Sequence, residues 1–486
     1  MAAAEMLGRG GSAADAAVAL YFVLAVTYPS AASLGGGGVC LVSDGNERAV
    51  YSLNFPAPRP AASGAATRLT AVPANVRGMA ALHARYGAID WRIVLAPAER
   101  IARLGKRLTR ASARSIESGG AALLSDGETR RVFAPTGALP REGAHLIQKD
   151  LADTIAALRL KGADDMYLGD LADRMVAATR LAGGSLAHED LRNFLPDWAP
   201  VRGLEFGNDL AYFAPPPAGA GLLAGQMWVM LTDRDRYGKA DEDETLHLLV
   251  EASRRAWAGR ERWLADDGTT VDLASLMSTD TARAALANYD PDRVSSVGTG
   301  PAPPSPTGGL QSTGFVVIDI LGDAVACTVT SYRPFGTGIM APGTGVLLAP
   351  APGPEDRNSL SLGPMIVFNP RVAKFKFAAV GGPGPAAAAA MMTVAAESVI
   401  KTGRLDTALH RTRMLIGEGN TVRIEASATS PQQESLTRRG HVLETVRSLG
   451  QVNAVFCPAG YPSEESQMLC WAETDPRGFG LVSIPY

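Results

Sequence analysis

Ser312 is placed where a hydroxyl group could cleave its own chain. It follows residues 293–311, and Val294 to Gln311 contain four Gly, four Pro, three Ser and two Thr, a composition that resists regular structure. A hydroxyl here can attack the preceding carbonyl, and hydrolysis of the ester would free an α-amine with an ordinary pKa of ~8, which can act as base. A Ser at a loop-to-strand boundary is usually a plain turn residue, and the nucleophile of a self-cleaving hydrolase is the alternative.

A second hydroxyl is expected beside Ser312. Phe315 to Ile320 and Ala324 to Thr330 are β-rich runs separated by Leu321-Gly322-Asp323, which predicts a hairpin with a short glycine turn. Folding about this turn brings Thr330 close to facing Ser312.

Gly381-Gly382-Pro383-Gly384-Pro385 forms a glycine turn between a predicted strand and an alanine-rich helix. Gly382, Gly384 and Ala387 fit the GxGxxA spacing of dinucleotide sites. The same turn could instead present backbone N–H groups to an oxyanion, although Pro385 has no N–H to offer.

Six histidines and four cysteines show no metal-ligand spacing, so we expect neither a metal nor a cofactor. Because no CxxC pair or dense framework is present, we expect free buried thiols. The cysteines are Cys40, Cys327, Cys457 and Cys470, and the histidines are His83, His145, His188, His247, His410 and His441.

Charge and hydropathy exclude several classes of protein. Lys and Arg number 46 and Asp and Glu 49, so the net charge of -3 gives no field to attract nucleic acid or an anionic membrane. The apolar run Ala16 to Val26 is shorter than the ~20 residues of a membrane span and lacks the basic flank of an export signal. The compartment stays unknown: cytoplasmic as written, periplasmic or secreted if the true start lies upstream.

The remaining sequence predicts a mixture of helices and sheets. Ser12 is a candidate N-cap with Asp15 three positions on, and the apolar helix that follows, Ala16 to Val26, must be buried. Gly35 to Gly38 lead into a hairpin, and Val76 to about Asp290 is mainly helical. Strands dominate after Ser312. This pattern favours layered α+β packing.

Several segments together resemble the γ-glutamyltranspeptidase (glutathione hydrolase) family, with order and spacing that match over nearly the whole chain. They are Gly10-Gly11-Ser12-Ala13-Ala14-Asp15-Ala16-Ala17-Val18, Leu34-Gly35-Gly36-Gly37-Gly38, Val72-Pro73 with Arg77-Gly78, Pro215-Pro216-Pro217-Ala218-Gly219, Glu251-Ala252, Phe335-Gly336-Thr337-Gly338 and Asp475-Pro476-Arg477-Gly478.

The resemblance implies a four-layer αββα sandwich of the N-terminal nucleophile hydrolase type, made as one chain and cleaved before a Thr. It implies a large-subunit-like segment, 1–311, in which 293–311 is a flexible linker, and a small-subunit-like segment, 312–486, together forming one folded domain. Members of the family hydrolyse γ-glutamyl amides such as glutathione, or transfer the γ-glutamyl group to an amine.

Counting back from Phe335-Gly336-Thr337-Gly338 places the nucleophile of the family at Ser312 and its supporting Thr at Thr330. Thr313 is the alternative nucleophile if the alignment shifts by one residue. Replacing Thr by Ser keeps the hydroxyl but loses the β-methyl that restricts χ1.

Other positions depart from the family. Pro56 stands where the resemblance places the Arg that binds the substrate α-carboxylate, with Arg59 as the alternative cation. Tyr332 replaces an Asn, and Ala349-Pro350-Ala351 to Pro354 replaces the residues that hold the α-amino group. The oxyanion glycines correspond to Gly384 and Pro385. We therefore expect catalytic roles for Ser312, Thr330 and Gly384, and substrate contacts from Thr313, Tyr332, Ser361 and Gly382.

Three functions follow. The first is a γ-glutamyltransferase-like amide hydrolase or acyltransferase, self-cleaved before Ser312, that acts on a small amide or peptide with specificity altered from γ-glutamyl. The second is a catalytically silent relative that serves as a binding or assembly module. The third is a nucleotide-binding enzyme that uses the glycine turn.

Overall fold

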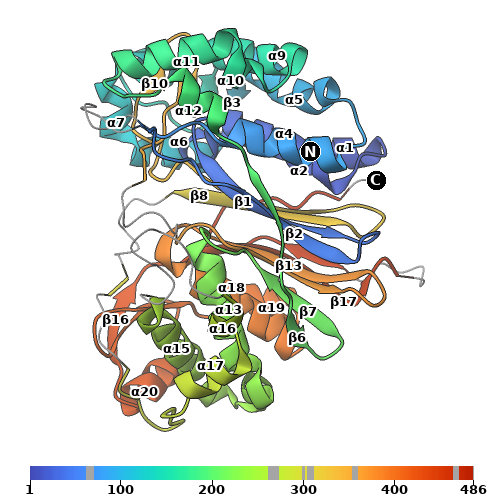
Figure 1. Ribbon diagram of the computed structural model, residues 1–486. Coiled ribbons are helices and arrows are strands. Elements are labelled where there is room, and N and C mark those ends of the chain that lie inside the picture. Colours follow the sequence, from blue (N-terminus) through green and yellow to red (C-terminus); the bar gives the residue numbers. More distant parts are fainter. Residues whose placement is uncertain are drawn as a thin grey trace.

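The computed structural model consists of two β-sheets packed face to face between two layers of helices (Figure 1). This confirms the layered α+β packing that the sequence pattern predicts and the four-layer αββα sandwich that the resemblance implies. Most of the predicted linker lies outside the described residues, as does Pro354. The structure describes residues 1–61, 70–260, 273–297, 302–303, 311–352, 360–463 and 470–484.

The first sheet combines strands from both sides of Ser312. Strand β1 pairs with β9 as well as with β2, all antiparallel. In spatial order its strands are β5 (Asp197–Pro200), β2 (Ala49–Phe55), β1 (Gly37–Asp44), β9 (Ala324–Thr330) and β8 (Ser312–Ile318).

The second sheet also combines strands from both sides of Ser312, because β7 pairs with β12 across a large separation in sequence. Its strands are, in spatial order, β18 (Trp471–Glu473), β17 (Gln451–Tyr461), β13 (Lys374–Gly382), β12 (Pro364–Asn369), β7 (Asp209–Phe213) and β6 (Leu204–Phe206).

The upper helical layer in Figure 1 covers the first sheet. It contains α1 (Ala2–Gly8), α2 (Ala13–Thr27), α3 (Pro29–Ala32), α4 (Asn75–Tyr86), α5 (Trp91–Leu104), α6 (Arg110–Ser118), α7 (Gly120–Ser125), α8 (Gly127–Phe133), α9 (Lys149–Lys161), α10 (Asp165–Leu168), α11 (Asp170–Leu181) and α12 (His188–Asn193), with the strand pairs β3 (Lys106–Arg107) and β4 (His145–Leu146), and β10 (Met340–Ala341) and β11 (Val346–Leu347).

The lower layer covers the second sheet (Figure 1). It contains α13 (Gly219–Thr232), η1 (Asp233–Asp235), α14 (Arg236–Lys239), α15 (Glu242–Ala258), α16 (Leu273–Leu276), α17 (Thr279–Ala285), η4 (Gly384–Ala386), α18 (Ala387–Ala395), η5 (Ala396–Ile400), α19 (Leu405–His410) and α20 (Ser430–Arg438), with the sheet of β14 (Met414–Ile416), β15 (Thr421–Glu425) and β16 (Val442–Val446).

Strand β9 illustrates why the sheets are apolar on both faces. Val325 and Val329 pack into the core under the upper helices, whereas Ala324 and Ala326 pack into the core between the sheets. Because successive side chains point to opposite faces, both sets can be buried at once. All seven residues of β9 are buried.

The predicted N-terminus of the first long helix is confirmed. The hydroxyl of Ser12 accepts a hydrogen bond from Asp15 N–H, and the Asp15 carboxylate accepts one from Ser12 N–H at 2.9 Å. This reciprocal capping satisfies two backbone donors that the first turn leaves open. Helix α2 is buried and ends at Thr27, before Pro29, as expected.

The prediction of free thiols is wrong. Cys40 and Cys327 form a disulfide between β1 and β9, and Cys457 and Cys470 form a second one, so no free cysteine remains. The partners of the first pair are 287 residues apart and become neighbours only through strand pairing.

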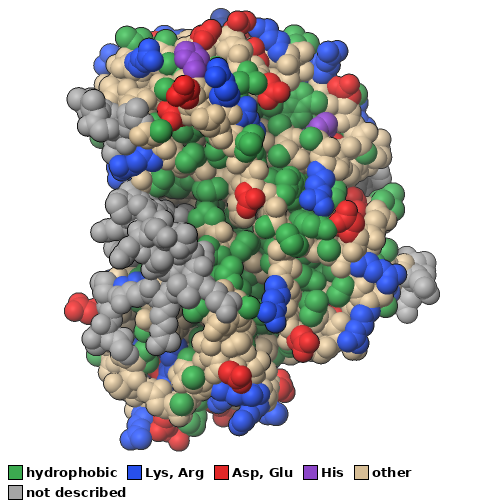
Figure 2. All heavy atoms as spheres, viewed as in Figure 1, with side chains coloured by type: hydrophobic (Ala, Val, Ile, Leu, Met, Phe, Trp, Pro, Cys, Tyr) green, Lys and Arg blue, Asp and Glu red, His purple; other side chains and the backbone are tan. Residues whose placement is uncertain are grey.

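The distribution of charged side chains on the surface agrees with the small net charge of the chain, -3. On the face drawn in Figure 2, basic and acidic side chains are interspersed over both helical layers, and apolar side chains gather between them. Within the described part of the chain, every helix is too short or too polar to cross a membrane.

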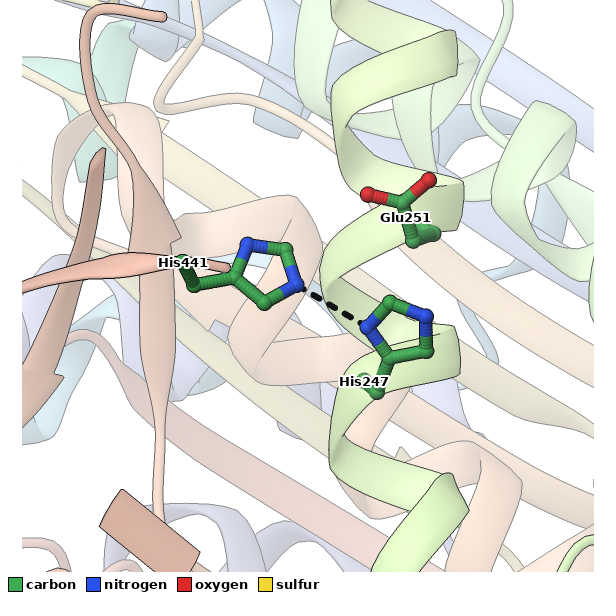
Figure 3. Close-up of side chains that lie close together, drawn as sticks. All are labelled: His247, Glu251 and His441. Atoms are coloured by element: carbon green, nitrogen blue, oxygen red, sulfur yellow. Dashed lines mark hydrogen bonds between the residues drawn. The ribbon is translucent and has the colours of Figure 1, made fainter. Parts of the chain in front are cut away.

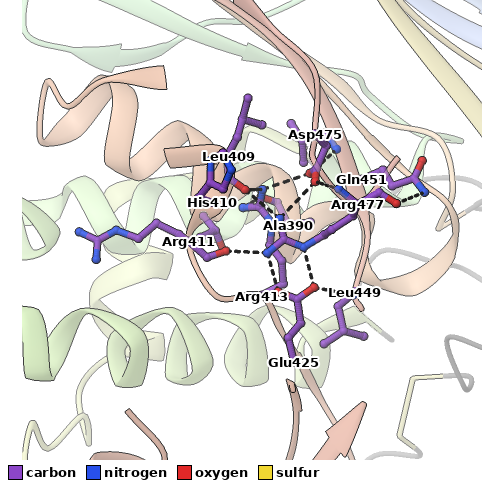
Figure 4. A network of polar contacts seen from close by, with 12 residues as sticks. Ala390, Leu409, His410, Arg411, Arg413, Glu425, Leu449, Gln451, Asp475 and Arg477 are labelled. Atoms are coloured by element: carbon purple, nitrogen blue, oxygen red, sulfur yellow. Dashed lines mark hydrogen bonds and ion pairs between the residues drawn. The ribbon is translucent and has the colours of Figure 1, made fainter. Parts of the chain in front are cut away.

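A buried ionic network fixes the C-terminal segment to the lower layer (Figure 4). Arg413 is fully buried and donates to Asp475 at 3.3 Å and to the carbonyl oxygens of Ala390 and Leu409. The Asp475 carboxylate also accepts from Val452 N–H at 3.0 Å. Burial lowers the pKa of the Arg413 guanidinium to about 10. Asp475, which also pairs with Arg477 at 3.1 Å, is therefore the carboxylate that balances the buried Arg413 cation.

Asp475→Ala should destabilise the fold by about 3–5 kcal/mol, because it leaves a buried guanidinium without its counter-ion. Asp164, whose side chain is 80% exposed beside Arg77, is the matched control, and Asp164→Ala should cost less than about 1 kcal/mol. Urea unfolding followed by circular dichroism measures both. Equal effects would contradict the role assigned to the network.

Candidate active site

Ser312 begins β8, the edge strand of the first sheet, and its side chain is buried. Only 5% of the residue is exposed, and its Oγ has no hydrogen-bond partner in the described part of the chain. An unpaired buried hydroxyl costs free energy, and a catalytic role is one reason for a fold to retain it.

Thr330 lies directly opposite Ser312, as the predicted hairpin requires. Its Oγ1 donates a hydrogen bond to the carbonyl oxygen of Gln311 at 2.6 Å and accepts one from Tyr332 N–H at 2.8 Å. The Thr330 hydroxyl therefore polarises the carbonyl that Ser312 would have to attack.

The alternation of side chains along β8 separates Ser312 from Thr313. Phe315 packs under the upper helices, and Val316 packs between the sheets. By the same alternation, Ser312 points toward the space between the sheets and Thr313 points toward the helices. The structure does not bring Thr313 to the group formed by Ser312 and Thr330.

Gly382 ends β13 of the second sheet and approaches Ser312 closely. A Cβ atom built at Gly382 would lie 2.7 Å from Ser312 Oγ, a separation that requires one of the two to move. Gly382 is therefore a glycine because the nucleophile candidate occupies the space of a side chain.

The turn after Gly382 places Gly384 beside Ser361. Gly384 has a φ of +72°, which favours glycine, and its N–H donates to Ser361 Oγ at 3.0 Å. The N–H that was expected to stabilise an oxyanion is thus already hydrogen-bonded. Pro385 follows and has no N–H.

Tyr332 occupies the neighbourhood of Pro56. Its phenol oxygen accepts a hydrogen bond from Ala57 N–H at 2.9 Å, and its backbone has a φ of +63°. Tyr332 thus makes two hydrogen bonds at the site. Its N–H donates to Thr330, and its phenol oxygen accepts from Ala57, just after the end of β2.

Sequence reasoning missed one contact. Gln311 Nε2 donates to the Tyr28 hydroxyl at 2.7 Å, which holds the side chain before Ser312 against the end of α2. Gly35 to Gly38 are expected to allow close packing, and a Cβ at Gly36 would lie 2.1 Å from Thr330 O, so the glycine loop is packed against the site. No local pattern around Tyr28 signals its contact, which depends on the tertiary fold.

His247 and His441, which looked isolated in the sequence, meet in the lower layer (Figure 3). His247 Nε2 lies 3.0 Å from Asp290 O, so it carries the proton and Nδ1 accepts from His441 Nε2 at 2.9 Å. Potential ligand atoms of both histidines and Glu251 lie within 4.8 Å of one another.

Glu251 argues against a metal at these histidines. Its two carboxylate oxygens accept hydrogen bonds from Arg254 and Arg255. A divalent cation would have to approach two buried guanidinium groups that already neutralise this carboxylate. We therefore interpret the histidine pair as structural, linking α15 to the start of β16.

Burial lowers the pKa of both histidines, and in His441 the neighbouring His247 adds to the effect and brings the pKa to about 4. The groups that face the pair are Glu244, Glu251, Arg254, Asp290 and Arg439. Both imidazoles are therefore neutral in the folded protein near pH 7.

Comparison with a family profile and comparison with individual proteins agree with each other. The profile described as Gamma-glutamyltranspeptidase matches residues 1–484. The glutathione hydrolase proenzyme of Pseudomonas aeruginosa is 30% identical over 371 residues, which is 71% of this chain and 64% of that protein. Human glutathione hydrolase 7 is 28% identical over 492 residues, 92% of this chain and 73% of that protein.

The fold has a solved counterpart. A cephalosporin acylase from Bacillus halodurans superposes with a TM-score of 0.85 and 22% identity, over 99% of this chain and 93% of that one. At this identity the match establishes the fold. The chain spans slightly less than two thirds of the length of the glutathione hydrolase proenzymes that it matches.

The histidine pair should make stability depend on pH. Since an unfolded histidine has a pKa near ~6.5, the unfolded chain binds protons first as the pH falls. The free energy of unfolding should therefore decrease as the pH falls below about 6.5, by up to ~1.4 kcal/mol per pH unit for each histidine, and the contribution of His441 should extend down to its folded pKa of about 4. His441→Gln should flatten this decrease, whereas His145→Gln, at an exposed position, should not. Urea unfolding at several pH values measures this pH dependence. An unchanged slope in His441→Gln would contradict the lowered pKa of the buried histidine pair.

Proposed function

Because the chain belongs to the γ-glutamyltranspeptidase family, we propose that it is a self-cleaving amide hydrolase or acyltransferase with Ser312 as its nucleophile. One observation carries the proposal: a buried serine hydroxyl without a partner lies beside a threonine that hydrogen-bonds to the preceding carbonyl. The names of the relatives, glutathione hydrolase proenzymes, agree with a chain that matures from a precursor.

In the cleavage step, Ser312 Oγ attacks the carbonyl carbon of Gln311. The charge that develops on the carbonyl oxygen is stabilised by Thr330 Oγ1–H, which the N–H of Tyr332 holds in place. The C–N bond breaks, the serine proton passes to the nitrogen, and an ester remains. Water hydrolyses the ester and leaves a carboxylate on Gln311 and a free α-amine on Ser312.

In turnover, the freed α-amine accepts the proton of its own hydroxyl as Oγ attacks a substrate amide. The leaving amine takes that proton, and the acyl group stays on Ser312 until water or a second amine removes it. We assign the backbone oxyanion contact to Gly384, with Ser361 beside it. In the uncleaved chain this N–H is bound to Ser361, so Thr330 serves the cleavage step.

We further propose that the acyl group is not the zwitterionic γ-glutamyl head. Binding that head needs a cation for its carboxylate and an acceptor for its ammonium. Position 56 is a proline, and the Tyr332 phenol oxygen at this place already accepts the N–H of Ala57. Tyr332 and Gly382 would instead contact an uncharged acyl chain.

Ser312→Ala should give an uncleaved chain whose amide hydrolysis is at least ~10³-fold slower, because nucleophile and base are lost together. Thr313→Ala is the matched control and should cleave normally, since Thr313 faces the helices. Intact-mass analysis and a denaturing gel distinguish a 486-residue chain from pieces of 311 and 175 residues. An uncleaved wild-type chain would favour the silent relative.

A panel of anilides tests the substrate. We expect release of aniline from uncharged acyl anilides to exceed release from γ-glutamyl anilide by more than about tenfold in kcat/KM, because the zwitterion would lose its water without gaining ion pairs. Ser312→Ala provides the background rate. A preference for γ-glutamyl anilide would show that other residues bind the charged head.

A further inference from the structure

The Cys40–Cys327 disulfide joins strands that lie on opposite sides of Ser312 in the sequence. Cys40 is the central residue of the β1 pairing and lies directly opposite Cys327 of β9. Both residues are fully buried. Cys40 belongs to residues 1–311 and Cys327 to residues 312–486.

We propose that this disulfide is a covalent link between the two chains that cleavage before Ser312 produces. The inference rests on the proposed cleavage. The mature protein would then be a disulfide-linked two-chain molecule, whose parts stay connected when the noncovalent contacts are lost.

The second disulfide cannot link the two cleavage products. Cys457 and Cys470 both lie in residues 312–486, 13 residues apart, so their bond closes a short loop within one product. Since no cysteine remains free, Cys40–Cys327 is the one bond that can span the cleavage site. The Cys40–Cys327 bond is therefore the one to test as a link between the products, and the Cys457–Cys470 bond is its control.

Burial sets the order of events. A folded chain shields both Cys40 and Cys327 from an oxidant, so the bond must form while β1 and β9 are still coming together. Cleavage needs Thr330 in its folded place beside Gln311, and therefore comes later. The link would exist before there are two chains to join.

The chemistry of the link is thiol–disulfide exchange. One cysteine thiolate attacks the disulfide of an oxidant, such as a protein or small-molecule disulfide, and the second thiolate displaces the mixed disulfide. The two cysteines lose two electrons and two protons, and the oxidant is released as two thiols. The proposal thus requires folding in an oxidising compartment.

The link has a consequence in the unfolded state. In the native protein each sheet joins strands of the two products, through the pairing of β1 with β9 and of β7 with β12, and these contacts hold the products together. After denaturation, only the disulfide keeps the products at a high effective concentration. Refolding of the cleaved protein should therefore be independent of protein concentration.

A gel with and without reductant tests the link. The purified full chain is denatured with N-ethylmaleimide, which blocks thiol exchange, and is then run in both conditions. We expect one species without reductant and two with it. Separation into two pieces without reductant would overturn the proposal. A single species in both conditions would show that cleavage, and the two-chain link with it, does not occur.

Variants and peptide mapping complete the test. Cys40→Ala should separate into two pieces without reductant, and Cys457→Ala should still run as one linked species. Digestion of unreduced wild-type protein should give a peptide pair that contains Cys40 and Cys327. This mapping needs neither variant to fold and tests the pairing even if the chain is not cleaved. Unlinked, alkylated Cys40 would overturn the proposal.

Discussion

The pairing of Ser312 with Thr330 across the β8–β9 hairpin is the constraint on which the site depends. A two-stranded antiparallel ladder fixes which residues face each other, and a shift by one residue would turn Ser312 toward the helices. The short turn after β8 sets this register. The hydroxyl of Thr330 reaches the carbonyl of Gln311 because the ladder continues to the first residue of the strand.

The second constraint is the close approach of the two sheets. β13 ends at Gly382, where a side chain would meet Ser312 Oγ, and Gly314 on β8 leaves no room for a Cβ beside Val380. The glycines on facing strands allow the sheets to come together at the nucleophile candidate. Ser312 and Thr330 are both buried there, and a hydrogen bond to a developing charge is stronger at a buried site than in water.

The sequence predicts the local parts of this arrangement well. The capping box at Ser12, the hairpin and the facing of Ser312 and Thr330 follow from short-range patterns. The disulfide of Cys40 and Cys327 does not, since their contact depends on β1 pairing with β9. The contacts of Tyr28 and of the paired histidines are missed for the same reason. The hydrogen bond from Gly384 to Ser361 depends on a backbone conformation that the residue types allow but do not impose.

The two chemical steps of the proposed function draw on different donors. Thr330 and the N–H of Tyr332 act on the carbonyl of Gln311, and both are already in place in the uncleaved chain. A substrate carbonyl would instead depend on Gly384, whose N–H is bound to Ser361, because Pro385 cannot donate. Loss of one oxyanion donor typically slows acyl transfer by about 10²- to 10³-fold. Cleavage and turnover are therefore separable, and efficient maturation of this chain would not by itself imply fast hydrolysis.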